Sequence, residues 1–196
     1  MSVSLSAAVT LGLLYFLSVG LNEQVAEGCK CLQRHPQQVF CESDIVIRVK
    51  VTGNVAGTRP DLVAYSVKVI TKYKPNNKKA IWVIYSDKTS CGAHLENGEY
   101  LLSGRVVAGV MVFGLCDLVW RWDQLPSVQK RNLNLYQTGC ACEITSCTGA
   151  SCLNTKHQRK CLVGVKNSIS LGYEEALQAV CLPGRHGSCR WQKGLK

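Results

Sequence analysis

The chain has 196 residues, a formal net charge of +10 and 12 cysteines, enough length for one large domain or two small ones. It contains no HExxH motif, nucleophile elbow or glycine-rich phosphate loop, and its four histidines stand apart in the sequence, so the common classes of enzyme are excluded. The positive charge predicts polyanionic partners.

The first predicted element is a signal peptide. Ala7–Leu21 is apolar but short for a membrane span, and polar residues follow it. Ala26 and Gly28 supply small residues at positions −3 and −1, so cleavage is expected between Gly28 and Cys29. Residues 1–28 then form the signal, the mature protein is secreted to the extracellular space or matrix, and its net charge rises to about +12 once Glu23 and Glu27 leave. A buried helix or membrane anchor is the alternative.

Period-two alternation of apolar residues then predicts five strands. Residues 44–53 and 62–75 alternate, residues 80–86 are apolar, and residues 99–116 read as two strands with a turn at 107–110. Five short strands around one core favour a small closed barrel, since closure removes exposed edges. Residues 125–140 fit a short helix that Ser127 caps, with Val128, Leu133 and Leu135 as apolar contacts.

The composition changes after Cys140. The remaining segment is dense in cysteine and poor in long apolar runs, so it depends on crosslinks, and we place a domain boundary at residues 139–142. All 12 cysteines follow the predicted signal, an even number that indicates disulfides in an oxidising compartment. Structural zinc is the alternative, but the cysteine spacings show no paired CxxC pattern.

The mature sequence resembles the tissue inhibitors of metalloproteinases along nearly its whole length. The resemblance rests on Cys29–Lys50 ("C.C…HPQ..FC.SD.VIR.K"), "SCG" at residues 90–92, "YLLSGRV" at 100–106, "GLCDLVWRWDQL" at 114–125, "GCACEITSC" at 139–147 and "CLPGRHGSCRW" at 181–191. It implies a mainly β fold: an OB-type five-stranded barrel with short helices, called the netrin-like module, over residues 29–140, and a disulfide-rich C-terminal subdomain over 141–196. The implied disulfides are Cys29–Cys91, Cys31–Cys116, Cys41–Cys140, Cys142–Cys189, Cys147–Cys152 and Cys161–Cys181.

The resemblance also implies a function for the first residues of the mature chain. The α-amine and carbonyl of Cys29 would chelate the catalytic zinc of a metalloprotease in a 1:1 complex, with no cofactor of the inhibitor's own. The protein would be a secreted, monomeric inhibitor of matrix metalloproteinases and related zinc endopeptidases, not an enzyme. The implied inhibitory ridge comprises Cys29, Lys30, Cys31, Leu32, Gln33, Thr89, Ser90 and Cys91.

Two residues of this ridge depart from the family. Lys30 stands where members usually carry a small Thr or Ser, and Gln33 where they carry a proline. The Lys30 side chain would enter the pocket next to the zinc, where its ammonium needs water or an acidic partner. We expect a narrowed range of target proteases; the alternative is a family fold that has lost strong inhibition.

Alternation also predicts a basic face, which resembles that of matrix-retained family members. If the first two strands are neighbours, their outward-facing cations form a surface suited to heparan sulfate, comprising Arg48, Lys50, Lys68, Lys72, Lys74, Lys78 and Lys79. An ordinary solvated face is the alternative. A second possible function follows, that of a netrin-like module which binds matrix or glycosaminoglycan without strong inhibition.

Overall fold

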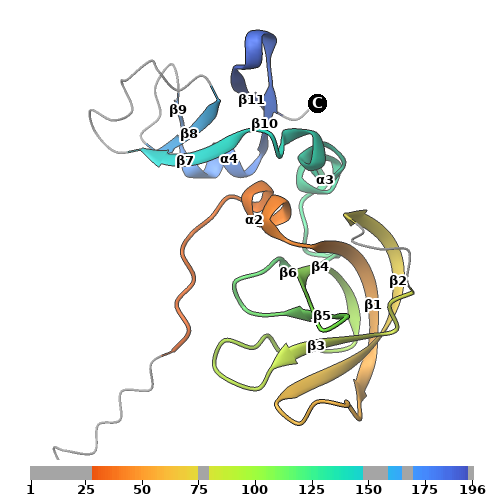
Figure 1. The fold of residues 1–196 in the computed structure, drawn as a ribbon. Helices are drawn as coiled ribbons and strands as arrows, with labels where there is room; N and C mark the ends of the chain where they lie inside the picture. The colour runs from red at the N-terminus through yellow and green to blue at the C-terminus, as the bar shows by residue number, and fades with distance from the viewer. Residues whose placement is uncertain (1–27, 75–79, 148–158, 165–169, 194–196) are drawn as a thin grey trace, which may run out of the picture.

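The computed structural model describes residues 28–74, 80–147, 159–164 and 170–193. Figure 1 shows a barrel, a smaller C-terminal part, and two helices, α2 and α3, between them. The barrel region contains β1 (Ile45–Val55), β2 (Leu62–Lys74), β3 (Val83–Asp87), β4 (Gly98–Val107), β5 (Val110–Phe113) and β6 (Val119–Arg121). The helices are α2 (Pro36–Glu42) and α3 (Ser127–Gly139). The C-terminal part contains β7 (Glu143–Cys147), β8 (Lys160–Gly164), β9 (Ser170–Leu171), α4 (Tyr173–Leu177), β10 (Ala179–Pro183), the 3-10 turn Arg185–Gly187 and β11 (Cys189–Lys193).

Five strands close the barrel in the order β1-β2-β3-β5-β4, and a β1–β4 pairing completes the ring. Only β3 and β5 run parallel within it; the other neighbours are antiparallel. This is the OB-type barrel that the resemblance implies. The predicted turn between the last two strands lies at Ala108 and Gly109, which both have positive φ, as a tight hairpin turn requires.

The side chains of β1 contribute to two hydrophobic cores, one on each face of the strand. Ile45, Ile47, Val49 and Val51 point into the barrel, as predicted. Val46 faces outward but is fully buried, because α2 and α3 cover that side of the sheet and form a second core with it. The outer face of β1 is therefore solvated only along part of its length.

Helix α2 has no counterpart among the predicted elements, although local signals for it exist. Pro36 occupies the first turn, where its missing N–H costs nothing, and His35 is the N-cap. The His35 ring accepts a hydrogen bond from the Gln37 N–H, while the Gln38 side chain accepts one from the His35 N–H. This reciprocal capping box starts a helix of only seven residues.

Helix α3 confirms the predicted helix but corrects two details. Ser127 is its first residue rather than its cap; the N-cap is Pro126, with no side-chain hydrogen bond. Leu135 is exposed, whereas Leu133 and Tyr136 are buried. Residues three apart share a helix face, so the inward face at Leu133 continues to Tyr136 and passes by Leu135.

The C-terminal part is held together by crosslinks and one small core. Strands β7, β8 and β9 form a parallel sheet, and β10 pairs with β11 as a hairpin. Disulfides Cys142–Cys189 and Cys161–Cys181 join these elements. The Trp191 indole N–H donates to the Leu162 carbonyl at 2.9 Å and so ties the hairpin to the sheet.

Candidate functional site

The segment that begins at Cys29 is anchored to the ends of two neighbouring strands. β3 and β5 are parallel, so their C-terminal ends lie at the same edge of the barrel, and Cys91 and Cys116 follow these ends. Disulfides join Cys29 to Cys91 and Cys31 to Cys116, with Cα separations of 4.9 and 5.3 Å. The Leu115 N–H donates to the Cys91 carbonyl at 2.9 Å, so the two receiving loops are also bonded to each other.

The disulfide pattern agrees with the resemblance wherever the structure describes both cysteines. Cys41–Cys140 links α2 to the end of α3, with a Cα separation of 5.4 Å. Together with the four bridges given above, it makes five of the six implied pairs. The sixth, Cys147–Cys152, involves Cys152, which lies outside the described residues.

The loop of Thr89, Ser90 and Cys91 is shaped by the residues on either side. The Asp87 carboxylate accepts a hydrogen bond from the Thr89 N–H at 2.7 Å, and this bond lowers the pKa of Asp87 below its ordinary value. The Gly92 N–H donates to the Thr89 carbonyl at 3.0 Å. A Cβ at Gly92 would lie 1.8 Å from the Asp87 carbonyl oxygen, so this tight turn requires glycine.

The predicted ridge residues come together and are accessible. Lys30, Cys31, Leu32 and Gln33 are exposed, as are Thr89, Ser90 and Cys91, while Cys29 is half-buried. The Leu32 side chain is 86% exposed, unusual for a leucine on a segment that two disulfides hold in place. Such an apolar side chain suits contact with a partner protein.

Sequence reasoning missed Leu115 as a member of this surface. Its side chain is 51% exposed, and it lies next to Cys116, the disulfide partner of Cys31. The one available signal was its place next to a ridge-anchoring cysteine, which puts it on the edge of the barrel where the ridge lies but does not indicate that it is exposed. Its exposure depends on the loop conformation after β5, which no sequence pattern indicates.

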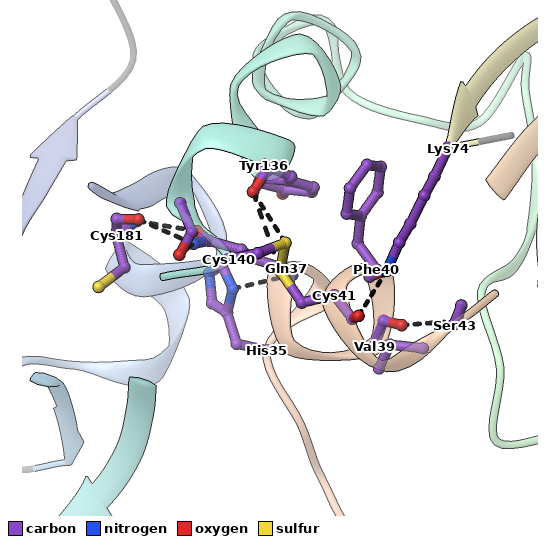
Figure 2. The surroundings of a disulfide bond; sticks show 11 residues. His35, Gln37, Val39, Phe40, Cys41, Ser43, Lys74, Tyr136, Cys140 and Cys181 are labelled. Carbon is purple, nitrogen blue, oxygen red and sulfur yellow. Dashed lines mark hydrogen bonds between the residues drawn. A yellow bond between two sulfur atoms is a disulfide. The ribbon is translucent and has the colours of Figure 1, made fainter. Parts of the chain in front are cut away.

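A buried set of hydrogen bonds anchors the ridge segment at its far end, where it enters α2 (Figure 2). The Gln37 side-chain amide donates to the carbonyls of Gly139 and Cys181 at 3.0 and 2.8 Å and accepts from the Cys181 N–H at 2.9 Å. The His35 Nε2 lies 2.7 Å from the Ala176 carbonyl oxygen. The end of α3 and the α4–β10 segment, both distant in sequence, thus meet the start of α2 at His35 and Gln37.

The whole-chain comparisons agree with this architecture. The family model described as "Tissue inhibitor of metalloproteinase" matches residues 27–191. The chain is 34% identical to Metalloproteinase inhibitor 3 of Xenopus laevis, over 92% of this chain and 88% of that protein. It is also 34% identical to Metalloproteinase inhibitor 2 of Canis lupus familiaris, over 96% and 91% of the two chains, and to the Homo sapiens inhibitor 2, over 86% and 83%.

The chain belongs to the tissue inhibitor of metalloproteinase family. A member of this family is an inhibitor of metalloproteinases and not an enzyme. Within the described part of the chain, no helix is long and apolar enough to cross a membrane.

The predicted basic face of this inhibitor is smaller than expected. β1 and β2 are neighbours, and Lys50 lies directly opposite Lys68, with both side chains exposed. Arg48 is instead paired with Glu99 at 2.5 Å and stacked on Trp122, its guanidinium carbon 4.2 Å from the ring centroid.

Lys74 is also removed from the basic face, because its ammonium donates to the carbonyls of Phe40 and Cys41 at the end of α2 (Figure 2). Burial lowers the pKa of Lys74. Lys72 is exposed. Lys78 and Lys79 lie outside the described residues. The prediction of one continuous face was wrong for Arg48, which the β4 residue Glu99 and Trp122 engage, and for Lys74, which the end of α2 engages.

Two groups of cysteine sulfurs in the described residues are close enough together to suggest a metal site. They are Cys29, Cys31 and Cys116, and Cys142, Cys181 and Cys189. All six sulfurs are in disulfides, which offer no thiolate for zinc.

Proposed function

We propose that the mature inhibitor begins at Cys29 and binds the catalytic zinc of its target protease through the α-amine and carbonyl of that residue. The anchored position of Cys29, bridged to Cys91 and two residues from a second bridge, supports this mechanism. A chain end held by covalent links loses little entropy on binding. The residues that make up the rest of the contact surface are Lys30, Cys31, Leu32, Gln33, Thr89, Ser90 and Cys91, joined by Leu115.

The chemistry of an α-amine suits this task. A catalytic zinc keeps one coordination position open, and an amine with its neighbouring carbonyl closes a five-membered chelate on the metal. The amine must be neutral to bind, and with an α-amino pKa of about 7.7–8.0 deprotonation at pH 7 costs only about 1–1.4 kcal/mol. A lysine amine would cost several times more. Because the chain would begin at the metal, no peptide bond would cross the cleavage point, and the inhibitor would not be a substrate.

The processing, location and stoichiometry of the protein are parts of the same proposal. The mechanism needs a free amine at Cys29, which exists only after cleavage. Residues 1–28 therefore act as a signal peptide, and the protein is secreted. Residues 29–140 form the inhibitory domain and residues 141–196 the C-terminal subdomain. One monomeric inhibitor blocks one protease and carries no cofactor of its own. Lys30 narrows the targets to proteases whose pocket is deep or ends in acidic groups.

The decisive experiment compares three forms of the protein against a panel of matrix metalloproteinase catalytic domains. The first form begins at Cys29, the second retains Gly28, and the third begins at Cys29 but has an acetylated α-amine. Only the first is expected to inhibit. If the form with Gly28 inhibits as well as the mature form, zinc chelation by the amine is refuted; if no form inhibits any protease, the inhibitory function itself fails.

A second function, glycosaminoglycan binding, is supported by Lys50 and Lys68. Like charges directly opposite each other on neighbouring strands are destabilising, and a bound sulfate group would relieve this repulsion. The mature protein is expected to leave a heparin column above physiological salt, and Lys50→Gln with Lys68→Gln together should shift elution to lower salt. The control for overall charge is Lys88→Gln, which is compared with each single variant, Lys50→Gln and Lys68→Gln, because all three remove one charge; the Lys88 ammonium donates to the Pro60 carbonyl instead. Equal elution of the three single variants would identify a general charge effect.

A further inference from the structure

Arg34 occupies the junction between the inhibitory ridge and helix α2. It follows Cys31 by three positions and immediately precedes the N-cap His35. One guanidinium nitrogen, Nη2, donates to the Cys116 carbonyl oxygen at 3.1 Å, and the other, Nη1, forms an ion pair with Glu42 at the end of α2. The Arg34 side chain is 31% exposed, so it lies against the protein rather than in solvent.

These contacts attach the ridge twice to the same residue. Cys31 is bound to Cys116 through the disulfide, and Arg34 is bound to Cys116 through its carbonyl. Only Leu32 and Gln33 lie between the two attachments. Residues 31–34 and Cys116 therefore form a small closed loop. The disulfide joins it at one end, and the hydrogen bond of the Arg34 guanidinium joins it at the other.

A half-buried carboxyl, that of Asp117, also lies near enough to interact with the charge of Arg34. Asp117 follows Cys116, and its carboxylate accepts a hydrogen bond from the Gly114 N–H at 2.8 Å. Burial raises the pKa of Asp117, while the Gly114 bond and the charges of Arg105 and Arg34 act in the opposite direction. Arg34 thus forms an ion pair with the Glu42 carboxylate and donates to one fixed carbonyl, that of Cys116, while its charge also acts on Asp117. A planar fork of donors suits several acceptors in fixed positions better than a lysine ammonium does.

We propose that Arg34 is a positioning residue of the inhibitor, which holds Leu32 and Gln33 in the direction that binding to the protease requires. Unlike a proline, Gln33 does not fix its own φ, and ordering such a segment on binding would lower affinity. The Arg34 contacts order it in advance. Arg34 acts through the ridge and makes no contact with the protease itself. The inference rests on the proposed function, because it concerns the fit of the same ridge.

The test uses the disulfide-intact mature protein and the protease of the panel that it inhibits most strongly. Inhibition constants are measured for Arg34→Ala, Arg34→Lys, Glu42→Gln and the double variant Arg34→Ala with Gln33→Pro. Arg34→Ala should weaken inhibition about tenfold, and Arg34→Lys by a similar amount, because lysine cannot reproduce the fork. Glu42→Gln should weaken it about threefold, since the guanidinium loses one of its anchors. The proline, which fixes φ, should restore most of the affinity lost in Arg34→Ala.

Two controls separate positioning from other roles. Melting temperatures show whether a variant is folded, and Glu42→Gln, at an exposed site away from the ridge, keeps the test usable if Arg34→Ala fails to fold. Full affinity in Arg34→Lys with unchanged affinity in Glu42→Gln would mean that the charge of Arg34 touches the protease directly, which overturns the proposal. Wild-type affinity in Arg34→Ala also overturns it. Failure of the unmodified inhibitor on the whole panel would instead reject the proposed function.

Discussion

Acidification should destabilise this inhibitor through His35, the buried cap of α2. The ring is 2% exposed, and both of its nitrogens have partners: Nδ1 accepts from the Gln37 N–H at 3.1 Å and Nε2 faces the Ala176 carbonyl at 2.7 Å. This arrangement suits only the neutral ring with its proton on Nε2. Protonation of Nδ1 would place two donors face to face and remove the helix cap.

The magnitude follows from the pKa. Burial lowers the pKa of His35 from 6.5 to about 4, with the bond to Ala176 opposing this only in part. The pKa of His35 is lower in the folded state than in the unfolded state. The contribution of this residue to the free energy of unfolding is therefore fully present above about pH 6.5 and is lost as the pH falls towards 4. At 1.36 kcal/mol per pKa unit, the loss from this residue is about 2 kcal/mol at pH 5 and approaches about 3.4 kcal/mol below pH 4.

The other groups near the His35 ring do not account for this difference in pH dependence. Tyr136 and Trp191 pack against His35, and burial raises the pKa of Tyr136, so its phenol stays neutral over the whole range. Glu175, next to Ala176, pairs with Lys193 at 3.6 Å. A variant that changes only His35 retains Tyr136 and the Glu175–Lys193 pair, so their contributions to the pH dependence cancel when the two proteins are compared.

Urea unfolding at pH 7, 5 and 4 of the disulfide-intact protein and of His35→Asn measures the effect. Asparagine is a good N-cap but does not titrate, so the wild-type protein should lose about 2 kcal/mol more than the variant between pH 7 and 5. Parallel pH dependence of the two proteins would refute the reasoning. If the variant does not fold, an NMR titration of the wild-type protein decides: a His35 pKa near 6.5 would contradict the assignment.

Three further predictions concern specificity, contact surface and packing. Lys30→Thr should broaden the range of proteases inhibited, because a small side chain fits pockets that cannot accommodate an ammonium; identical profiles on the panel would show that Lys30 does not select targets. Leu115→Ala should weaken inhibition about fivefold with little change in melting temperature, since it removes an exposed apolar contact; unchanged inhibition would place Leu115 outside the contact surface. Gly139→Ala should cost about 2 kcal/mol or more in urea unfolding, because its Cβ would lie 2.2 Å from the Gln37 amide nitrogen. Gly172→Ala, whose Cβ would meet nothing within 4 Å, is the control, and an equal loss in both would contradict the packing argument.

Most residues of the cysteine-anchored ridge can be predicted from the sequence. Its residues were named from motifs, and the structure brings Cys29–Gln33 and Thr89–Cys91 to one edge of the barrel. Leu115 and Arg34 were missed, because their roles depend on a loop after β5 and on a carbonyl 82 positions away from Arg34. Neither relation leaves a periodic trace in the sequence.

The sequence by itself determined the properties that depend on near neighbours. The alternation from Ile45 to Val51 specified a strand with one face in a core, and the turn at Ala108 and Gly109 was marked by its composition. The family motifs added the pairing of the cysteines.

Only the tertiary structure decided which polar groups are exposed. Arg48 and Lys74 alternate like the other cations of their strands, yet one stacks on Trp122 and the other caps the end of α2. His35 and Gln37 look like loop residues but hold the barrel and the C-terminal part together. The physical reason is that periodicity assigns a side chain to a face of its own element, while the element that packs on that face comes from a distant part of the chain.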